Sequence, residues 1–548
     1  MRRLFLFLFF ILPLISISQN KGLLTGGFES NIQWYSKDQN QFAPDFKDYF
    51  RSNNYLKLDY QYKNIFAGVQ FESYAPGALL NYDPKLDKTF GLATFFLKYQ
   101  LENLELTAGY FYEQFGSGLI LRLWEDRQLG INNALRGGRI RFTPFKPITL
   151  TGIYGNQRLG FEVTEENIAG LNAEIGLNQL FKHDSYSLKL GFSYVVRFLV
   201  WDRPTMEAAG TTHSYSSRIS FNKNNLYSTF EYVRKGDDAL VELGQIIPEK
   251  VFKGNALLLN MGYSKSGLGI NAAFRRLENM NFYSSRKDAG NIYNRSIINY
   301  LPSLTKQHDY GLANIYIYQT QSKLSFNPLA KSGEIGFQFD LFYQIKKGSA
   351  LGGKYGTNLA INFSRWHGLK ATYDIQNRSY NSTSLKFGEK YFQDLNFEVR
   401  KKWTTKTFSI FTFINSFYNK KYIEETTGKV DFTIIAAETI LKLNAGKSMK
   451  FIVQHLWTKD DKKNWAASTY EYNFSSRFSV FVSDMYNYGN DEALDKKHFY
   501  NFGGNYSKGK VRISLGYGRQ RGGLLCLGGI CRVVPESTGF TLTLNTSF

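Results

Sequence analysis

The chain has 548 residues, of which 17% are aromatic, and its formal net charge at neutral pH is +21. It holds 37 Tyr and 47 Phe but only 11 Pro, a balance that favours β-strands, because proline cannot donate to a sheet ladder. After the first 18 residues no apolar run approaches the roughly 18 residues that a membrane-spanning helix needs, which excludes a helical membrane protein.

Residues 1–18 predict a signal peptide. Arg2 and Arg3 give a positively charged start, an apolar run follows over residues 4–17, and small residues at the −3 and −1 positions place the cleavage before Gln19. No cysteine follows the run, so a lipoprotein is not expected. For an exported chain with scattered basic residues, nucleic acid is a poor explanation of the charge. Cations in a lumen or at a rim would instead face anionic lipid phosphates or an acidic partner.

Alternation of apolar and polar residues with a period of two runs through the remaining chain and predicts strands. Clear examples begin at Leu56, Leu104, Tyr186 and Ile335. The strand that begins at Met449 is less regular, because Ile452 and Leu456 fall on its polar side. These strands predict an all-β, transmembrane, antiparallel β-barrel of about 26 strands, within a range of about 22 to 26. We expect one domain, residues 19–548, in the outer membrane.

Tight turns are the second signal of a barrel, because bacterial barrels have short periplasmic turns and longer outer loops. The sequence predicts such turns at Lys63-Asn64, Glu102-Asn103, Pro144–Pro147, Lys182–Asp184, Lys223–Asn225, Lys265–Gly267, His367-Gly368, Thr404–Lys406, Asn444–Gly446, Ser475-Ser476 and Ser507–Lys510. The turn within Gln319–Gly333 is ambiguous. An even strand number places both termini in the periplasm.

The last eleven residues predict the strand that closes the barrel. Its apolar face carries Phe540, Leu542, Leu544 and Phe548, whereas small polar residues occupy the other face. A terminal Phe on such a strand resembles the signal that the outer-membrane insertion machinery recognises. The last strand of a soluble sandwich is the alternative. Just upstream, Cys526 and Cys531 bracket a Leu-Gly-Gly-Ile turn, and we expect a disulfide across this hairpin rather than a metal site.

The connection Gln114–Gly138 combines apolar residues with charges in a way that a flexible polar loop does not. Its candidate residues are Arg122, Trp124, Glu125, Asp126, Arg127 and Arg136. We predict that it folds into the lumen as a plug or constriction, with a folded surface loop as the alternative. Catalysis by the adjacent carboxylates is a distant third, because their side chains would point apart on a strand and neighbouring arginines would lower their pKa.

Two stretches carry a resemblance to known proteins. They are YEQFGSGLILRLWEDRQLGINNALRGGRI (Tyr112–Ile140) and RGGLLCLGGICRVVPESTGF (Arg521–Phe540). Both resemble an uncharacterised family of Bacteroidota outer-membrane barrel proteins. The resemblance extends over the mature chain and implies an outer-membrane barrel, without a reaction or substrate. Large barrels of this phylum include subunits of assembly and secretion machines, which implies an accessory role by analogy.

The connection Asn279–His308 is the longest candidate outer loop. Its tyrosines Tyr283, Tyr293 and Tyr300 are candidate contacts for a protein partner, and a mobile solvated loop is the alternative. The six histidines lack metal-ligand spacing, no nucleophile elbow occurs, and no cofactor motif is present, so we expect no enzyme. The sequence favours a structural or accessory subunit that contacts lipoproteins or other barrels. The alternative is a porin-like solute pore constricted by Gln114–Gly138.

Overall fold

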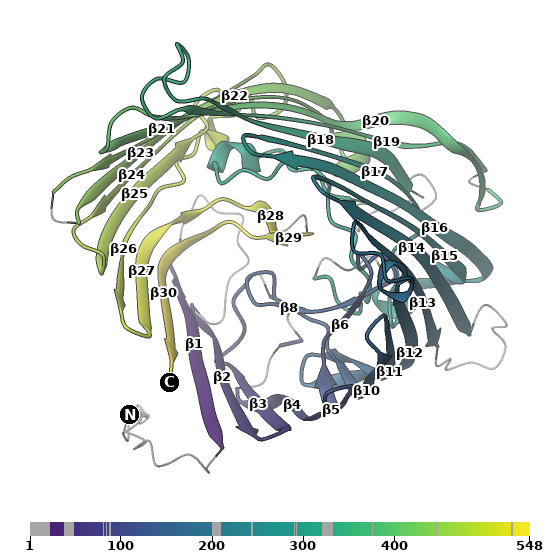
Figure 1. Ribbon diagram of the computed structural model, residues 1–548. Helices are drawn as coiled ribbons and strands as arrows, with labels where there is room; N and C mark the ends of the chain where they lie inside the picture. The colour runs from purple at the N-terminus through teal and green to yellow at the C-terminus, as the bar shows by residue number, and fades with distance from the viewer. Residues whose placement is uncertain are drawn as a thin grey trace.

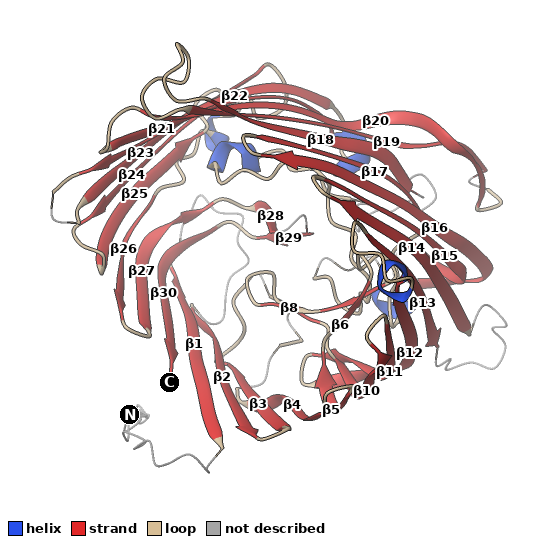
Figure 2. Ribbon diagram, viewed as in Figure 1, coloured by secondary structure: helices blue, strands red, loops and turns tan. Residues whose placement is uncertain are grey.

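The structure is a computed structural model that describes residues 22–37, 49–80, 82–83, 85–86, 89–199, 210–242, 245–289, 291, 293–320, 333–374, 376–444, 446–527 and 530–548. The predicted signal peptide lies outside the described residues, as does most of the ambiguous stretch 319–333. Figure 2 shows strands almost throughout, with a few short helical turns. Among the described residues, no helix has the length and apolar character needed to cross a bilayer.

Among the described residues, the wall of the molecule is one closed ring of 24 antiparallel strands (Figure 1). Its last strand, β30 (Ser537–Ser547), pairs with both β27 (Val511–Gln520) and β1 (Leu23–Tyr35), so the sheet has no free edge. The predicted barrel fold is therefore confirmed. The strand number of 24 lies within the predicted range of about 22 to 26 and below the expected number of about 26.

The other wall strands follow in chain order: β2 (Phe50–Tyr62), β3 (Ile65–Tyr74), β4 (Gly91–Gln100), β5 (Leu104–Phe111), β10 (Leu135–Phe145), β11 (Ile148–Leu159), β12 (Glu162–Gly176), β13 (Ser187–Phe198), β14 (Thr211–Lys223), β15 (Leu226–Glu242), β16 (Gln245–Lys265), β17 (Leu268–Glu278), β18 (Gly333–Ile345), β19 (Thr357–Asp374), β20 (Ser379–Lys402), β21 (Thr407–Asn419), β22 (Lys429–Lys442), β23 (Ser448–Thr458), β24 (Trp465–Asn473), β25 (Phe478–Tyr486) and β26 (Asn501–Lys508). Three separate pairs join β6 (Glu113–Phe115) to β7 (Leu121–Leu123), β8 (Glu125–Asp126) to β9 (Ile131–Asn132), and β28 (Gly523–Leu527) to β29 (Ile530–Val534). The helical turns are α1 (Leu177–Leu180), α2 (Lys420–Ile423), η1 (Arg286–Asp288), η2 (Gly311–Asn314) and η3 (Ala493–Asp495).

The two ends of the barrel differ in their connections. At the short-turn end, eleven connections join the strands, and none is longer than the segment 346–356. Both chain ends of the wall lie here, since Leu23 pairs with Gln61 and Thr546 pairs with Val511. The opposite, long-loop end holds the extended connections, among them 112–134 and the one whose described part ends at residue 320.

Ten of the eleven predicted tight turns coincide with connections at the short-turn end, and the one at His367-Gly368 is wrong. These two residues lie within β19, and the connection is 346–356 instead. The register between β19 and β20 shifts around His367, so the alternation breaks there although the strand continues. The true turn contains glycines with positive φ at Gly348, Gly353 and Gly356.

Side chains alternate between the outer surface and the lumen, as the period-two pattern predicts. Trp34, Tyr154 and Leu171 are 61%, 56% and 62% exposed, whereas Tyr35 and Ile153, next to them in sequence, are buried. The outer surface is thus largely apolar, and the buried core of the molecule lies inside the ring.

Candidate functional site

Among the described residues, several segments from the long-loop end enter the lumen, and we call three of them the lumen inserts. The first insert comprises residues 112–134, the second insert the described part of 279–320, and the hairpin insert residues 521–536 with β28 and β29. Figure 1 shows β6, β8, β28 and β29 inside the ring of wall strands. They gather the residues for which the sequence predicted a functional role.

The first insert packs on an apolar belt of the inner wall. Its Phe115, Ile120 and Leu121 are fully buried. The apolar belt consists of lumen-facing residues on neighbouring strands, namely Ile153, Ile168, Val195, Val233, Ala256, Leu258 and Leu277. A Cβ on Gly170 would lie 3.0 Å from the Phe115 ring, so a glycine makes room for this side chain. Burying such side chains stabilises the insert by about 1.5–3 kcal/mol each.

The second insert crosses the lumen from one side of the wall to the other. Near its start, Phe282 and Ile298 pack with the first insert and the apolar belt. Further along, Leu312 and Tyr318 pack against a different part of the wall, formed by Trp366, Phe392, Tyr418, Phe432 and Leu456. Leu304 contacts both clusters and links them.

The first and second inserts are joined by backbone and side-chain contacts. The Arg122 N–H donates to the Ile298 carbonyl at 2.8 Å, and the Tyr300 N–H donates to the Gly118 carbonyl at 2.9 Å. The Arg122 guanidinium lies over the rings of Tyr300 and Trp124, at 3.8 and 4.8 Å from their centroids. The two segments therefore form one folded unit.

Arg127 connects the first insert to the wall. Its guanidinium is 2.8 Å from the Glu29 carboxylate on β1 and 3.2 Å from the Glu125 carboxylate, and it also donates to Gln70 on β3. Burial alone would raise the pKa of Glu125, but Arg127 and the Gln70 amide outweigh burial and hold this pKa below its ordinary value. Asp126 has a local role and accepts the Leu129 N–H at 2.9 Å.

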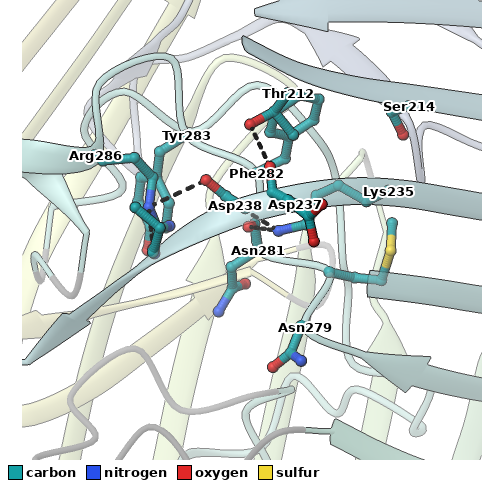
Figure 3. A network of polar contacts seen from close by, with 12 residues as sticks. Thr212, Ser214, Lys235, Asp237, Asp238, Asn279, Asn281, Phe282, Tyr283 and Arg286 are labelled. Carbon is teal, nitrogen blue, oxygen red and sulfur yellow. Dashed lines mark hydrogen bonds and ion pairs between the residues drawn. The ribbon is translucent and has the colours of Figure 1, made fainter. Parts of the chain in front are cut away.

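Asp238 on β15 connects the second insert to the wall (Figure 3). Its carboxylate is 2.9 Å from both Arg197 and Lys235, and 3.4 Å from Arg286 on η1 of the insert. Arg197 also donates to the Tyr283 carbonyl, and Lys235 to the Asn281 carbonyl, both at 2.9 Å. Removing this carboxylate would leave buried cations uncompensated, which is costly.

The hairpin insert completes the set. Cys526 and Cys531 are joined by a disulfide and face each other across β28 and β29, while the two turn residues lie outside the described ranges. The Asn294 side chain donates to the Cys531 carbonyl at 3.3 Å, and Arg521 donates to the Asn314 carbonyl at 2.6 Å. The hairpin thus contacts the second insert at two places.

Five of the six charged and aromatic candidates of the predicted plug lie in the first insert, and Arg136 does not. The predicted segment ends four residues too late, because residues 135–138 belong to β10 and the Arg136 side chain is exposed. Gly137 and Gly138 pair with Gly109 and Ala108 of the wall. A Cβ on Gly137 would lie 2.0 Å from the Tyr154 carbonyl oxygen, so the glycine there permits close strand pairing rather than a loop.

The predicted outer loop 279–308 belongs to the second insert. Tyr283 is 2% exposed, Tyr300 stacks on Arg122, and Tyr293 lines a cavity of about 60 Å³ between the inserts. A partner contact by these tyrosines stays a prediction. Sequence reasoning missed the apolar belt, Glu29 and Asp238. The sequence signal that could have revealed such wall contacts is an apolar residue on an otherwise polar face of a strand, as at Leu456.

The lumen towards the short-turn end has a different chemistry from the apolar belt. Lys57 and Asp59 on β2 lie 3.2 Å apart, and Arg139 on β10 pairs with Glu105 and Glu113. This part of the inner wall is polar and charged. Among the described residues, no group of three or more His, Cys, Asp or Glu side chains could hold a metal ion. The arrangement can hold segments inside the barrel, and it lines a polar space beneath them.

The short-turn end itself carries a basic rim. We define the basic rim as the Lys and Arg residues in its eleven connections, together with the lysines that end the flanking strands. It comprises Lys63, Lys146, Lys182, Lys223, Lys265, Lys346, Lys347, Lys354, Lys402, Lys406, Lys442, Lys447, Arg477, Lys508 and Lys510. The same connections contain two acidic residues, Glu102 and Asp184. Positive charge therefore dominates this end.

The closing strand carries the predicted C-terminal signal residues. Phe540 and Phe548 are 53% and 49% exposed, and the ring centroid of Phe540 is 4.6 Å from that of Tyr517 on β27. Leu542 and Leu544 are half-buried and pair with Ile32 and Ser30 of β1. Recognition of this strand by insertion machinery stays a prediction.

Three solved structures that are similar to this chain share at most 10% of its residues. The P pilus usher (PapC) translocation pore is 9% identical over 96% of this chain and 99% of that chain, with a TM-score of 0.42. The copper transporter OprC is 10% identical over 97% and 81%, with a TM-score of 0.40. The outer membrane protein opdK of Pseudomonas aeruginosa is 8% identical over 96% and 98%, with a TM-score of 0.37. These similarities carry no argument about function.

No curated protein matches the sequence. A family model described as a family of unknown function (DUF6029) matches residues 1–548. The match confirms the predicted resemblance to an uncharacterised family, while the phylum of that family stays a prediction.

Proposed function

Because this chain belongs to the DUF6029 family, whose description assigns no activity, we propose its function from the geometry of the lumen inserts. We propose that it is an integral outer-membrane β-barrel with a closed lumen that serves as a structural or accessory subunit of an outer-membrane complex, without catalysis. Both chain ends and the short turns face the periplasm.

The outer wall supports a membrane location. The ring is closed, so its backbone groups are paired without water, as a lipid environment requires. The outward side chains are largely apolar, and exposed aromatic residues occur near both ends of the wall, for example Trp34 and Trp403. Such aromatic girdles sit at the two interfaces of a bilayer.

We infer that the barrel is closed from the packing of the lumen inserts. They are fixed by fully buried apolar residues such as Phe115 and by ion pairs such as Arg197–Asp238, in which both side chains are buried. Contacts of this kind do not open by thermal motion of a loop, because several must break together. A barrel sealed in this way supports a role carried by its rims and loops rather than by solute flux.

A solute pore is the second candidate, and the polar inner wall below the inserts favours it. Lys57, Asp59 and Arg139 line a space that could hold water and ions. On this reading the first insert constricts the channel, and the cations of the wall give anion preference.

Single-channel conductance in a planar bilayer tests the proposal. We compare the intact protein with a variant that lacks residues 116–133 of the first insert. The matched control lacks residues 491–496, an exposed part of a connection at the long-loop end. The intact protein and the control are expected to be silent, and the first-insert deletion is expected to conduct.

A steady, anion-selective current through the intact protein would replace the subunit proposal with the pore. If the intact protein is silent, purification from membranes under mild conditions should recover a lipoprotein or a second barrel with it. If the barrel is recovered in full yield and no partner protein accompanies it, this result would count against the subunit role.

A further inference from the structure

The basic rim is an interaction surface that the closed-barrel proposal does not use. We propose that it binds the anionic headgroups of phospholipids in the membrane leaflet around the short-turn end. This inference rests on the proposed membrane location, but it does not depend on whether the lumen is closed.

The basic rim has few counter-charges of its own. Its lysines are exposed, and among the described residues Lys63, Lys146, Lys223, Lys265, Lys406 and Lys510 form no ion pair within 4.0 Å. The long-loop end also has exposed lysines, such as Lys370 and Lys459, but it mixes them with paired cations: Lys420 pairs with Asp461 at 2.5 Å and Arg295 with Asp83 at 2.7 Å. Charge left unpaired at one end attracts anions from outside the protein.

The depth of the rim matches that of lipid phosphates. Lys63 lies over the ring of the exposed Tyr62, and Lys402 over that of Tyr355, at 5.3 and 4.8 Å from the centroids. Trp403 follows Lys402 directly and is 51% exposed. Tyr and Trp mark the level of the headgroups, so lysines beside them or one residue beyond them reach the phosphates.

The distribution of the charges around the barrel favours lipid over an acidic protein. Ten of the eleven connections at the short-turn end carry a Lys or Arg within them or at the end of a flanking strand, and the exception is the connection around Glu102. The cations therefore follow the circumference instead of gathering on one side. A protein partner would contact one sector, whereas lipids surround the whole wall.

The test measures lipid preference in bilayers with spin-labelled lipids. The full chain is reconstituted in phosphatidylcholine bilayers. The fraction of labelled phosphatidylglycerol that contacts the protein directly is compared with the same fraction for labelled phosphatidylcholine. The rim variant changes the six lysines named above to Gln. The control variant makes the same change at six exposed lysines of the long-loop end: Lys370, Lys386, Lys421, Lys429, Lys459 and Lys496.

We expect the intact protein and the control variant to prefer phosphatidylglycerol by at least about twofold. The preference should fall towards equality in the rim variant, and in the intact protein at high salt, where screening is strong. An unchanged preference in the rim variant would overturn the proposal, as would no preference in the intact protein. Loss of an acidic protein from the rim variant, without any lipid preference, would assign the rim to a protein partner instead.

Two further outcomes separate this proposal from the proposed function. A barrel that fails to insert into bilayers contradicts the membrane location itself, whatever its charges do. A lipid preference that persists in a conducting barrel leaves the rim proposal standing while the closed-lumen function falls.

Equal loss of preference in both lysine variants would mean that net charge alone attracts the lipid, and the rim proposal would fail.

Discussion

Arg127 of the first insert donates to the Glu29 carboxylate at 2.8 Å, and Glu29 belongs to β1, the strand on which the ring closes. This ion pair therefore joins the first insert to the strand at which the barrel wall closes. Each side chain is about a quarter exposed, so the pair is shielded from solvent but not isolated from it.

A double-mutant cycle measures this connection. Arg127→Met and Glu29→Gln should show a coupling of about 1.5–3 kcal/mol in the stability of the first insert, because each change removes the charge-assisted hydrogen bond between the two side chains. Hydrogen exchange of residues 112–134 reports that stability. The more exposed pair Lys57–Asp59 is the matched control, and its coupling should stay below about 1 kcal/mol. Equal couplings in the two cycles would contradict the assignment.

Asp238→Asn should loosen the second insert by about 3–5 kcal/mol, because Arg197 and Lys235 stay buried without a full counter-charge. Limited proteolysis from the long-loop end should then cut between residues 279 and 320. Asp374→Asn provides the control, since that carboxylate is fully exposed at the end of β19. Resistance of the Asp238 variant to cleavage would show that the ion pairs do not hold the insert.

Phe115→Ala should destabilise the first insert by about 3–5 kcal/mol through a cavity against the apolar belt. The expected readout is faster hydrogen exchange in residues 112–134 and brief current steps in a planar bilayer. Phe142 on β10 is 38% exposed, and Phe142→Ala should change neither quantity. A silent bilayer with unchanged exchange in the Phe115 variant would disprove the packing role.

The titration of His308 should make the stability of the second insert depend on pH. Burial, with a contribution from Lys306, lowers its pKa to about 4, and its ring is 2.6 Å from the Asn396 side-chain oxygen. The unfolded segment takes up a proton near pH 6.5, and the folded one does so only near pH 4. Stability is therefore full above about pH 6.5 and falls as the pH drops towards 4, by at most about 1.4 kcal/mol per unit.

Hydrogen exchange of residues 303–320 between about pH 7 and pH 5, corrected for intrinsic rates, checks this slope. His308→Gln removes the titrating group while keeping a side chain that can hydrogen-bond, so the slope should disappear. A slope that survives in this variant would assign the pH dependence to another group.

Much of the wall could be predicted because a lipid-facing strand repeats a two-residue pattern that the turns interrupt. The failure at His367-Gly368 shows the limit of the method. A bulge also breaks alternation, and sequence alone does not separate a bent strand from two strands.

The lumen inserts were predictable only in part, for a physical reason. The apolar content of the first insert indicated burial, but the polar residues of 279–308 indicated solvent, and these residues bond to the wall and to each other instead. Wall residues such as Val195 and Leu456 interrupt polar faces because they touch the inserts. In the sequence alone, where the contacting inserts are not known, such residues look like irregularities in the alternation of a strand.

The contacts inside the barrel also impose an order on its assembly. Asp83 must meet Arg295, and Asn294 must meet Cys531, which lies 237 positions further along the chain. Contacts this distant form late, after the intervening chain has been placed. The interior is thus completed only when the last hairpin arrives, so a chain that stalls before its final strands would leave a hole in the membrane rather than a smaller sealed barrel.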